Sequence, residues 1–295
     1  MLIVSCSHGK HIGNLIAKNL SIKNSNLSVD KFPDDELRIR YNSKLKNKDV
    51  VLVQSFYQNI SDCIIEVILA AKGARELKAK KVVLVAPYFP YLRQDKRFHK
   101  GESISQSIIA GLIDKYFDAV YIIDPHLHRK SKLEQVFKIR AKKLTANKLV
   151  AEYIKKNIKN ATIIGPDEES FKWAKNVAEF LGIESRILKK KRYSSYHVEV
   201  QLNKNIDLRN KNAVIVDDIV STGHTILETA KILRKLKAMK IYCICIHGIF
   251  VNDALNKLKK DGINVISTNT IPNKAAKIDV SDLIAQSLRT IQSNR

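Results

Sequence analysis

Cysteine is scarce in this chain of 295 residues, and its four cysteines, Cys6, Cys63, Cys243 and Cys245, form no CxxC pair. Their spacing provides no framework for a disulfide-rich fold or a zinc site, so we expect buried thiols in a reducing cytosol. Long hydrophobic runs are also missing, and the apolar start MLIV is too short for a signal peptide. The sequence therefore predicts a cytoplasmic protein that makes no use of a membrane.

No stretch alternates aromatic with basic residues, and there is no helix-turn-helix or RNA-module signature. Their absence matters because 52 Lys and Arg stand against 29 Asp and Glu, a formal charge of +23. This charge favours a polyanionic partner, either nucleic acid or a phosphorylated substrate. The alternative is a set of solvated helix faces, since most cations are lysines spaced among apolar residues. We expect no specific binding of nucleic acid.

Apolar runs alternate with amphipathic stretches along the chain. Runs such as DVVLVQSF, KKVVLVAPYF and NAVIVDD have the length of buried strands, and SFKWAKNVAEFLG has the spacing of a helix. This alternation is typical of α/β proteins with parallel sheets. Several of the runs end in polar residues, and ligands of open α/β sheets bind beyond the carboxyl ends of the strands. No linker rich in proline, glycine or serine marks a boundary, which we place after residue 145.

The stretch VIVDDIVSTGHT, residues 214–225, combines an apolar strand, two acids and a short loop before a helical pattern. Backbone N–H groups, loop hydroxyls and the helix dipole favour a phosphate at such a place. A simple turn with a Ser/Thr helix cap is the alternative. A cap alone does not explain Asp217 and Asp218 at the end of the strand. A sugar phosphate explains both features, because a carboxylate accepts hydrogen bonds from vicinal ribose hydroxyls.

This stretch resembles the 5-phosphoribosyl-binding motif of type I phosphoribosyltransferases and their relatives. Seven further segments, in chain order, resemble the ribose-phosphate pyrophosphokinase family: FPDDELRIR (32–40), YLRQDKR (91–97), IIDPHLH (122–128), IIGPDEESFKWAKNVAEFLG (163–182), KKKRY (189–193), IHGIF (246–250) and TNTIP (268–272). The resemblance covers about residues 29–288, and the stretch after His126 looks more like the archaeal members. It implies an α/β fold of two phosphoribosyltransferase-like domains, each a largely parallel sheet flanked by helices. Residues 1–145 would carry the ATP-binding segments, and residues 146–295 the ribose-5-phosphate loop and the catalytic loop.

The resemblance also implies an activity. Family members transfer the β,γ-diphosphoryl group of ATP to the anomeric hydroxyl of ribose 5-phosphate, which gives the activated sugar and AMP. We therefore expect ATP and ribose 5-phosphate as substrates and Mg²⁺ as cofactor. The family's adenine-binding segment reaches in from a neighbouring subunit, which implies a homodimer or a larger homo-oligomer.

The family motifs assign a role to individual residues. The implied ATP-binding residues are Phe32, Asp34, Asp35, Glu36, Arg93 and Gln94. The implied ribose-5-phosphate-binding residues are Arg192, Asp217, Asp218, Ser221, Thr222, Gly223, His224 and Thr225. Lys190 and Arg192 match a catalytic loop whose cations stabilise the transferring phosphoryl group. His126 and Asp167 match the residues that hold the metal.

Two segments depart from the family pattern. Asp35 stands where glycine is usual, and Glu168, Glu169 and Ser170 follow Asp167 where small residues and glycine are usual. These departures leave room for a regulatory homologue without activity. A phosphoribosyltransferase that consumes the activated sugar is a second alternative, although it would not need FPDDE and YLRQDK. Taken singly, each segment also has a plainer interpretation: a charged loop around Arg93, a hydrogen-bonded loop histidine at His126, and a solvated basic turn in KKKR.

Overall fold

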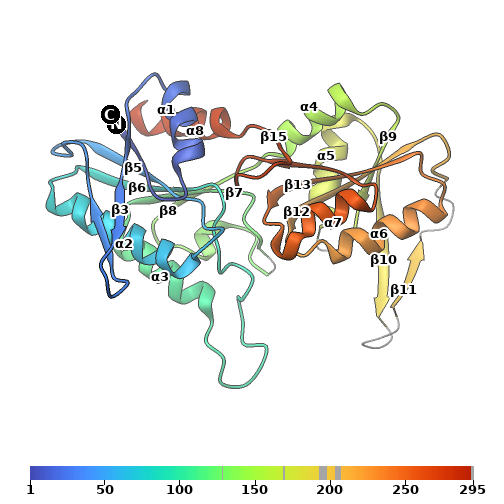
Figure 1. The fold of residues 1–295 in the computed structure, drawn as a ribbon, viewed down its shortest axis with the longest axis horizontal. Coiled ribbons are helices and arrows are strands. Elements are labelled where there is room, and N and C mark those ends of the chain that lie inside the picture. Colours follow the sequence, from blue (N-terminus) through green and yellow to red (C-terminus); the bar gives the residue numbers. More distant parts are fainter. Residues whose placement is uncertain (128, 169, 193–197, 203–206, 294–295) are drawn as a thin grey trace. The chain divides into compact units, whose positions relative to one another are not determined.

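The computed structural model describes residues 1–127, 129–168, 170–192, 198–202 and 207–293, apart from the side chains of 188–192, 198–202 and 291–293. The chain divides into two units (Figure 1). Unit 1 comprises Met1–Thr145 and the C-terminal segment from Val280, and unit 2 comprises Ala146–Asp279. No helix in these ranges is both long and apolar enough to cross a bilayer.

Unit 1 is built on a parallel sheet of six strands in the order β2-β1-β5-β6-β7-β8. Its strands are β1 (Leu2–Ser5), β2 (Asn24–Asn26), β5 (Asp49–Val53), β6 (Lys81–Ala86), β7 (Ala119–Ile123) and β8 (Arg140–Leu144). The inner strands β5, β6 and β7 are buried along nearly their whole length. They are continuous apolar runs because helices cover both faces of the sheet. A separate antiparallel hairpin joins β3 (Ser28–Lys31) to β4 (Leu37–Arg40).

The helices of unit 1 are α1 (Lys10–Asn19), α2 (Ile60–Glu76), α3 (Ser105–Tyr116) and α8 (Ser281–Ser293), with the short 3₁₀ turn η1 (Leu133–Gln135). α2 and α3 lie on one face of the sheet, and α1 and α8 lie together on the other (Figure 1). Asn19 Nδ2 donates to Ser281 Oγ at 3.0 Å, and Arg289 Nη2 donates to the Asn19 carbonyl at 2.8 Å. This last helix was expected in the second domain, whereas in the structure it packs on unit 1.

Unit 2 contains a sheet of seven strands in the order β11-β10-β9-β12-β13-β14-β15. Its strands are β9 (Ala161–Gly165), β10 (Ser185–Arg192), β11 (Val198–Leu202), β12 (Asn212–Val220), β13 (Lys240–Gly248), β14 (Asn264–Thr268) and β15 (Ala276–Ile278). All neighbouring pairs are parallel except β10 and β11, which form an antiparallel ribbon. The helical elements are α4 (Asn147–Asn157), α5 (Phe171–Leu181), α6 (His224–Lys235), η2 (Val251–Asp253) and α7 (Ala254–Lys260).

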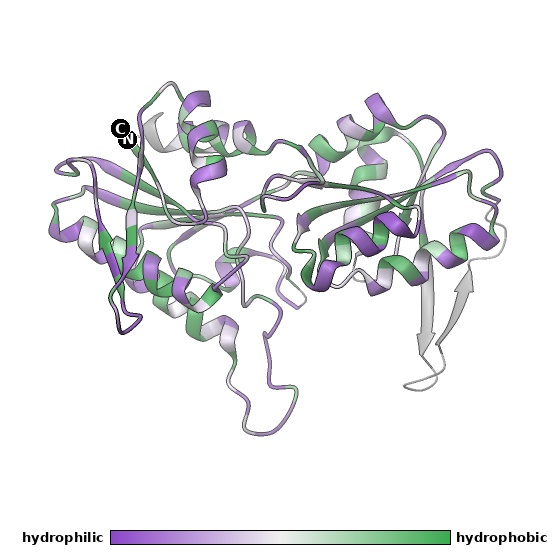
Figure 2. Cartoon of the chain, in the orientation of Figure 1, coloured by the Kyte–Doolittle hydropathy of each residue, from purple (hydrophilic) through white to green (hydrophobic). Residues whose placement is uncertain are grey.

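The distribution of apolar residues explains these layers. Figure 2 shows largely apolar inner strands in both sheets, whereas the helices mix apolar with polar residues. Burying the apolar stripe of each helix against a sheet removes both from water, which is the main driving force for this architecture. The four cysteines are free and buried, as the sequence predicted. The predicted α/β fold with two largely parallel sheets flanked by helices is confirmed.

Candidate functional site

The strand order of unit 2 makes a topological switch point between β9 and β12, which is where open α/β sheets are expected to form a ligand crevice. β9 continues through α5 to β10 on one side, while β12 continues through α6 to β13 on the other. Two neighbouring strands whose connections diverge form a topological switch point, and open α/β sheets bind ligands beyond the carboxyl ends of such strands. Asp167 follows β9, and the loop 221–223 follows β12. The fold therefore directs two of the predicted site segments to one place.

The acid pair lies inside β12, and its predicted position at the strand end is wrong. β12 pairs with β9 only as far as Ile215, but its pairing with β13 continues to Val220. Asp217 and Asp218 thus belong to a stretch of strand that has lost its neighbour on the β9 side. The two carboxylates are nevertheless well covered, with 8% of Asp217 and 3% of Asp218 exposed.

Ser170, at the start of α5, connects the acids of this crevice. Its Oγ donates to Asp217 Oδ1 at 2.8 Å, and its backbone N–H donates to Asp167 Oδ1 at 2.8 Å. Asp217 Oδ1 also accepts a hydrogen bond of 2.8 Å from the backbone N–H of Asp218. Sequence reasoning gave Ser170 no role. The sequence feature that could have indicated a role was a serine at the start of the helix that follows the strand, where side-chain and backbone donors meet.

Electrostatics at this crevice favour a positively charged or hydrogen-bond-donating ligand. Burial raises the pKa of Asp217 well above its ordinary value, and the charges of Asp218 and Asp167 raise it further, while the Ser170 hydrogen bond lowers it. Carboxylates that repel one another in a poorly solvated place are stabilised by a cation or by hydroxyl donors. Mg²⁺ fits this donor set, because it takes one or two carboxylates and completes its shell with water and phosphate oxygens. It needs no closed cage, and the described residues hold no group of three or more ligands suited to a metal.

The loop after β12 leads directly into the N-terminus of α6. Gly223 is the N-cap residue with φ of +75°, and a Cβ there would lie 3.2 Å from Leu258 Cδ1. The left-handed backbone and the tight contact both favour glycine. No side chain caps the helix at Gly223, and its first turn holds no acidic residue. The first-turn N–H groups are thus not satisfied by a side-chain cap, which suits an anion.

The remaining predicted residues lie in this loop (Ser221 and Thr222) or in the first turn of α6 (His224 and Thr225). Thr222 and His224 are exposed, whereas Ser221 and Thr225 are half-buried. The order of strand, loop and helix agrees with the sequence analysis. The acids in β12 and this loop are close in sequence, so the two segments that are predicted to bind the sugar and its phosphate are neighbours along the chain.

In unit 1 the segment predicted to bind adenine forms the turn of the β3–β4 hairpin. The Phe32 N–H donates to the Glu36 carbonyl at 2.8 Å, and the Asp35 N–H donates to the Phe32 carbonyl at 2.9 Å. Phe32 is 44% exposed, with Arg38 Cζ 5.3 Å from its ring centroid. Asp34, Asp35 and Glu36 are exposed. Asp35 has φ of +71°, which explains why glycine suits this position.

Arg93 and Gln94 lie in the long connection between β6 and α3 (Figure 1). Gln94 Oε1 accepts a hydrogen bond of 2.7 Å from Ser105 Oγ, and its carbonyl accepts one of 3.3 Å from the Gln106 N–H. These two contacts fix Gln94 to the start of α3. Arg93 is exposed, so its guanidinium is accessible to a ligand.

The last predicted site residues are His126 and the two catalytic cations, Lys190 and Arg192. His126 is half-buried on the segment that follows β7. Lys190 and Arg192 belong to β10, where the backbone pairs Lys190 with Val200 and Arg192 with Val198 of β11. The side chains of both cations lie outside the described part of the chain. Their catalytic role therefore stays a prediction.

Comparisons with known proteins cover almost the whole chain. Residues 1–116 match the family described as the N-terminal domain of ribose phosphate pyrophosphokinase, and residues 132–290 match the phosphoribosyl transferase domain. The ribose-phosphate pyrophosphokinase of Pyrococcus furiosus is 36% identical over 281 residues, which are 95% of this chain and 97% of that protein. The ribose-phosphate pyrophosphokinase of Methanothermobacter thermautotrophicus is 33% identical over 289 residues, which are 98% of this chain and 100% of that protein.

A solved structure has the same fold over the same extent. The crystal structure of phosphoribosylpyrophosphate synthetase from Mycobacterium smegmatis superposes with a TM-score of 0.88 and covers 100% of this chain and 99% of that one. Its sequence is 22% identical, so the likeness concerns the fold.

Proposed function

This chain belongs to the ribose-phosphate pyrophosphokinase family, and we propose that it transfers the diphosphoryl group of ATP to the 1-hydroxyl of ribose 5-phosphate in a Mg²⁺-dependent reaction that releases AMP. The product, 5-phosphoribosyl 1-diphosphate, supplies nucleotide biosynthesis. One observation carries the proposal from this chain's own geometry. At the switch point of unit 2, buried acids and an uncapped helix N-terminus lie on either side of the end of β12.

Ribose 5-phosphate binds at this switch point in our proposal. The Ser221–Thr225 loop holds the 5-phosphate with backbone N–H groups and hydroxyls, helped by the dipole of α6. Asp217 accepts hydrogen bonds from the ribose hydroxyls. Its Oδ1 already accepts from Ser170 Oγ and the Asp218 N–H, so we assign Oδ2 to the sugar. The phosphate and the carboxylate then meet opposite ends of the ligand, which keeps the two negative groups apart.

The family motifs assign Mg²⁺ to two residues, Asp167 and His126, and the contacts within unit 2 support Asp167 as a ligand of the ion. Asp167 suits it because its carboxylate is half-buried and adds to the negative potential at Asp217. When bound, the ion supplies positive charge that neutralises the diphosphate oxygens. Asp218 adds negative charge at the same crevice, which raises its attraction for a cation.

ATP binds through segments of unit 1. Phe32 stacks on the adenine, Asp34 and Glu36 offer acceptors to its amino group, and Asp35 shapes the turn that carries them. Arg93 grips phosphate oxygens as a fork, with Gln94 beside it. If the adenine turn serves a neighbouring subunit, as in the family, the active form is a homodimer or a larger homo-oligomer.

The reaction itself needs positioning and charge more than covalent chemistry. The 1-hydroxyl oxygen forms a bond to the β-phosphorus of ATP, the bond from that phosphorus to the bridging α,β-oxygen breaks, and AMP leaves with the bridging oxygen. The hydroxyl proton passes to solvent. Lys190 and Arg192 lower the barrier by pairing with the negative charge that gathers on the transferring group.

Incubation of the purified chain with ATP, ribose 5-phosphate and Mg²⁺ tests the proposal, with ³¹P NMR as the readout. We expect equal amounts of AMP and 5-phosphoribosyl 1-diphosphate. A reaction without ribose 5-phosphate is the control for simple ATP hydrolysis. No AMP, or AMP that forms equally fast without the sugar, would contradict the proposal. Consumption of the activated sugar with a free base would point to a phosphoribosyltransferase instead.

A further inference from the structure

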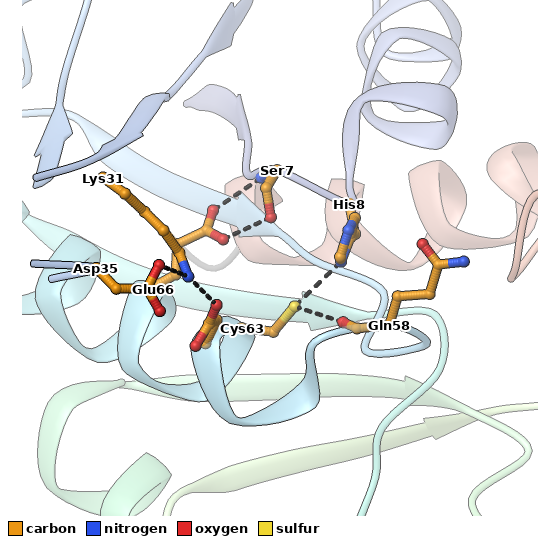
Figure 3. Close-up of polar contacts among 8 residues, drawn as sticks. Ser7, His8, Lys31, Asp35, Gln58, Cys63 and Glu66 are labelled. Carbon is orange, nitrogen blue, oxygen red and sulfur yellow. Dashed lines mark hydrogen bonds and ion pairs between the residues drawn. The ribbon is translucent and has the colours of Figure 1, made fainter. Parts of the chain in front are cut away.

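A lysine at the base of the β3–β4 turn connects that turn to α2. Lys31 Nζ lies 2.7 Å from Asp35 Oδ1 within the turn and 2.9 Å from Asp62 Oδ2 on the first turn of α2. Figure 3 shows the lysine side chain extended toward Asp35 above this helix. One ammonium group thus bridges two carboxylates from separate elements. Its hydrogen bonds to Asp35 and then to Asp62 raise the pKa of Lys31, so it stays charged at neutral pH.

The turn needs an external support because its backbone conformation is unfavourable. Asp35 has φ of +71°, in the left-handed region that residues with a Cβ avoid, although aspartate tolerates it better than most. Glycine would adopt this conformation freely, whereas aspartate brings a carboxylate that Lys31 contacts. The ion pair therefore stabilises the one residue at which the turn is strained.

The other end of the bridge is fixed to the core of unit 1. Asp62 lies four residues before Glu66, so the two acids share a face of α2. Glu66 is 2% exposed and accepts hydrogen bonds from the Ser7 N–H at 2.8 Å, from Ser7 Oγ at 2.5 Å and from Gln54 Nε2 at 3.1 Å. Figure 3 shows Glu66 directed at Ser7.

These contacts lie at the switch point of unit 1. β1 continues through α1 to β2 on one side, and β5 continues through α2 to β6 on the other. Here the chain's own Glu66 takes the donors of Ser7 and Gln54, beside a pocket that Lys31 and Asp62 also line. These hydrogen bonds hold α2 against the ends of β1 and β5. Asp62 on the same helix is therefore held in place, and through Lys31 it holds the hairpin.

We infer that Lys31 is a positioning residue for ATP, which sets the place of the turn that carries Phe32, Asp34 and Glu36. The inference rests on the proposed function, because it takes this turn as the adenine-binding segment. Lys31 acts through the two carboxylates it bridges and not through a contact with the nucleotide. Exposed ion pairs contribute little to global stability, so the effect falls on the turn and not on the fold.

Steady-state kinetics of Lys31→Met in the full chain tests the inference. We expect the KM for ATP to rise about three- to tenfold, as the loss of two exposed ion pairs implies. The KM for ribose 5-phosphate, kcat and the melting temperature should stay within error. Lys31→Arg keeps both bridges and should retain most of the ATP affinity. Lys72→Met is the matched control, since it breaks the exposed Lys72–Glu76 pair of 3.5 Å elsewhere on α2.

Asp62→Asn separates positioning from direct contact. If Lys31 acts as a bridge, this variant also raises the KM for ATP, and Lys31→Met/Asp62→Asn is no worse than Lys31→Met alone. If Lys31 instead touches an ATP phosphate, Asp62→Asn releases the lysine and leaves the KM for ATP unchanged or lower, which overturns the inference. An unchanged KM in Lys31→Met also overturns it. A wild-type chain that makes no AMP from the two substrates removes the proposed function, which is a distinguishable failure.

Discussion

Replacing Asp217 with asparagine is the most direct test of the sugar-phosphate site. Asp217 Oδ1 accepts from Ser170 Oγ and from the Asp218 N–H, both at 2.8 Å. Both donors need an acceptor, so the amide oxygen of asparagine will take this place. The amide NH₂ group must then stand where Oδ2 stood. A charged acceptor for the ribose hydroxyls becomes a neutral donor, while the shape of the side chain is kept.

The size of the effect follows from that change. A hydrogen bond to a charged group contributes roughly 1.5–3 kcal/mol, and each 1.4 kcal/mol corresponds to about a tenfold change in affinity. Asp217→Asn should therefore raise the KM for ribose 5-phosphate about ten- to hundredfold. The KM for ATP should change much less, because the adenine turn and Arg93 belong to other segments.

The same variant should not weaken the fold. Burial, followed by the charge of Asp218, raises the pKa of Asp217. Ionisation of an acid whose pKa is raised in the folded state destabilises that state. The free energy of unfolding therefore falls as the pH rises from the unfolded pKa of about 3.9 through the folded pKa. A neutral asparagine removes this penalty. At neutral pH and without ligand, the melting temperature of Asp217→Asn should equal or exceed that of the wild type.

Initial rates measured against each substrate, with the other saturating, give the two KM values. Asp207→Asn is a matched control in the same unit, because Asp207 is exposed and pairs with Arg209 at 2.7 Å. Equal weakening toward ATP and ribose 5-phosphate would assign Asp217 to the metal and not to the sugar. A KM for ribose 5-phosphate that stays at the wild-type value would refute the reasoning about Oδ2.

Three further outcomes are expected. Asp167→Asn should raise the Mg²⁺ concentration needed for half-maximal activity and lower turnover with the fold intact; an unchanged Mg²⁺ titration would exclude Asp167 from the metal site. Lys190→Ala should depress kcat more than either KM, because its contact strengthens as the phosphoryl group transfers, and a pure KM effect would contradict this. Dilution to monomers, followed by mass photometry alongside the activity assay, should abolish turnover if Phe32, Asp34 and Glu36 serve a neighbour; an active monomer would disprove shared sites.

The alternation of apolar runs and amphipathic stretches was enough to predict parallel sheets and their helices. Such local patterns do not say which surface a terminal helix covers. α8 carries an apolar face that fits either sheet in principle, and the sequence analysis placed it with the unit that precedes it. Its partner α1 lies at the other end of the chain, and Asn19 at the end of α1 donates a hydrogen bond to Ser281 and accepts one from Arg289. Contacts between residues so far apart in the chain leave no periodic pattern in the sequence.

The position of the acids in β12 was missed for a related reason. The residue at which a strand ends depends on its neighbouring strands. The two neighbours of β12, β9 and β13, extend to different points along it. β9 ends at Gly165, while β13 continues to Gly248 and keeps β12 extended as far as Val220. An acid pair in the sequence looks like the end of a buried strand, because buried carboxylates are unusual. Here both acids are buried within a strand that is paired on the β13 side only at their level.

Ser170 donates hydrogen bonds to two acids of unit 2, which the net charge of its segment does not reveal. The segment after Asp167 departs from the family pattern, and its two glutamates suggested only added negative charge. In the structure the third residue of this departure, Ser170, is 4% exposed and donates one hydrogen bond to Asp167 and another to Asp217. A glycine at this position keeps the backbone donor and loses the hydroxyl. The serine hydroxyl lowers the pKa of Asp217, opposing burial and the neighbouring acids, and so favours the ionised form that ribose hydroxyls require. The departure from the family pattern thus includes a donor that supports the proposed sugar site.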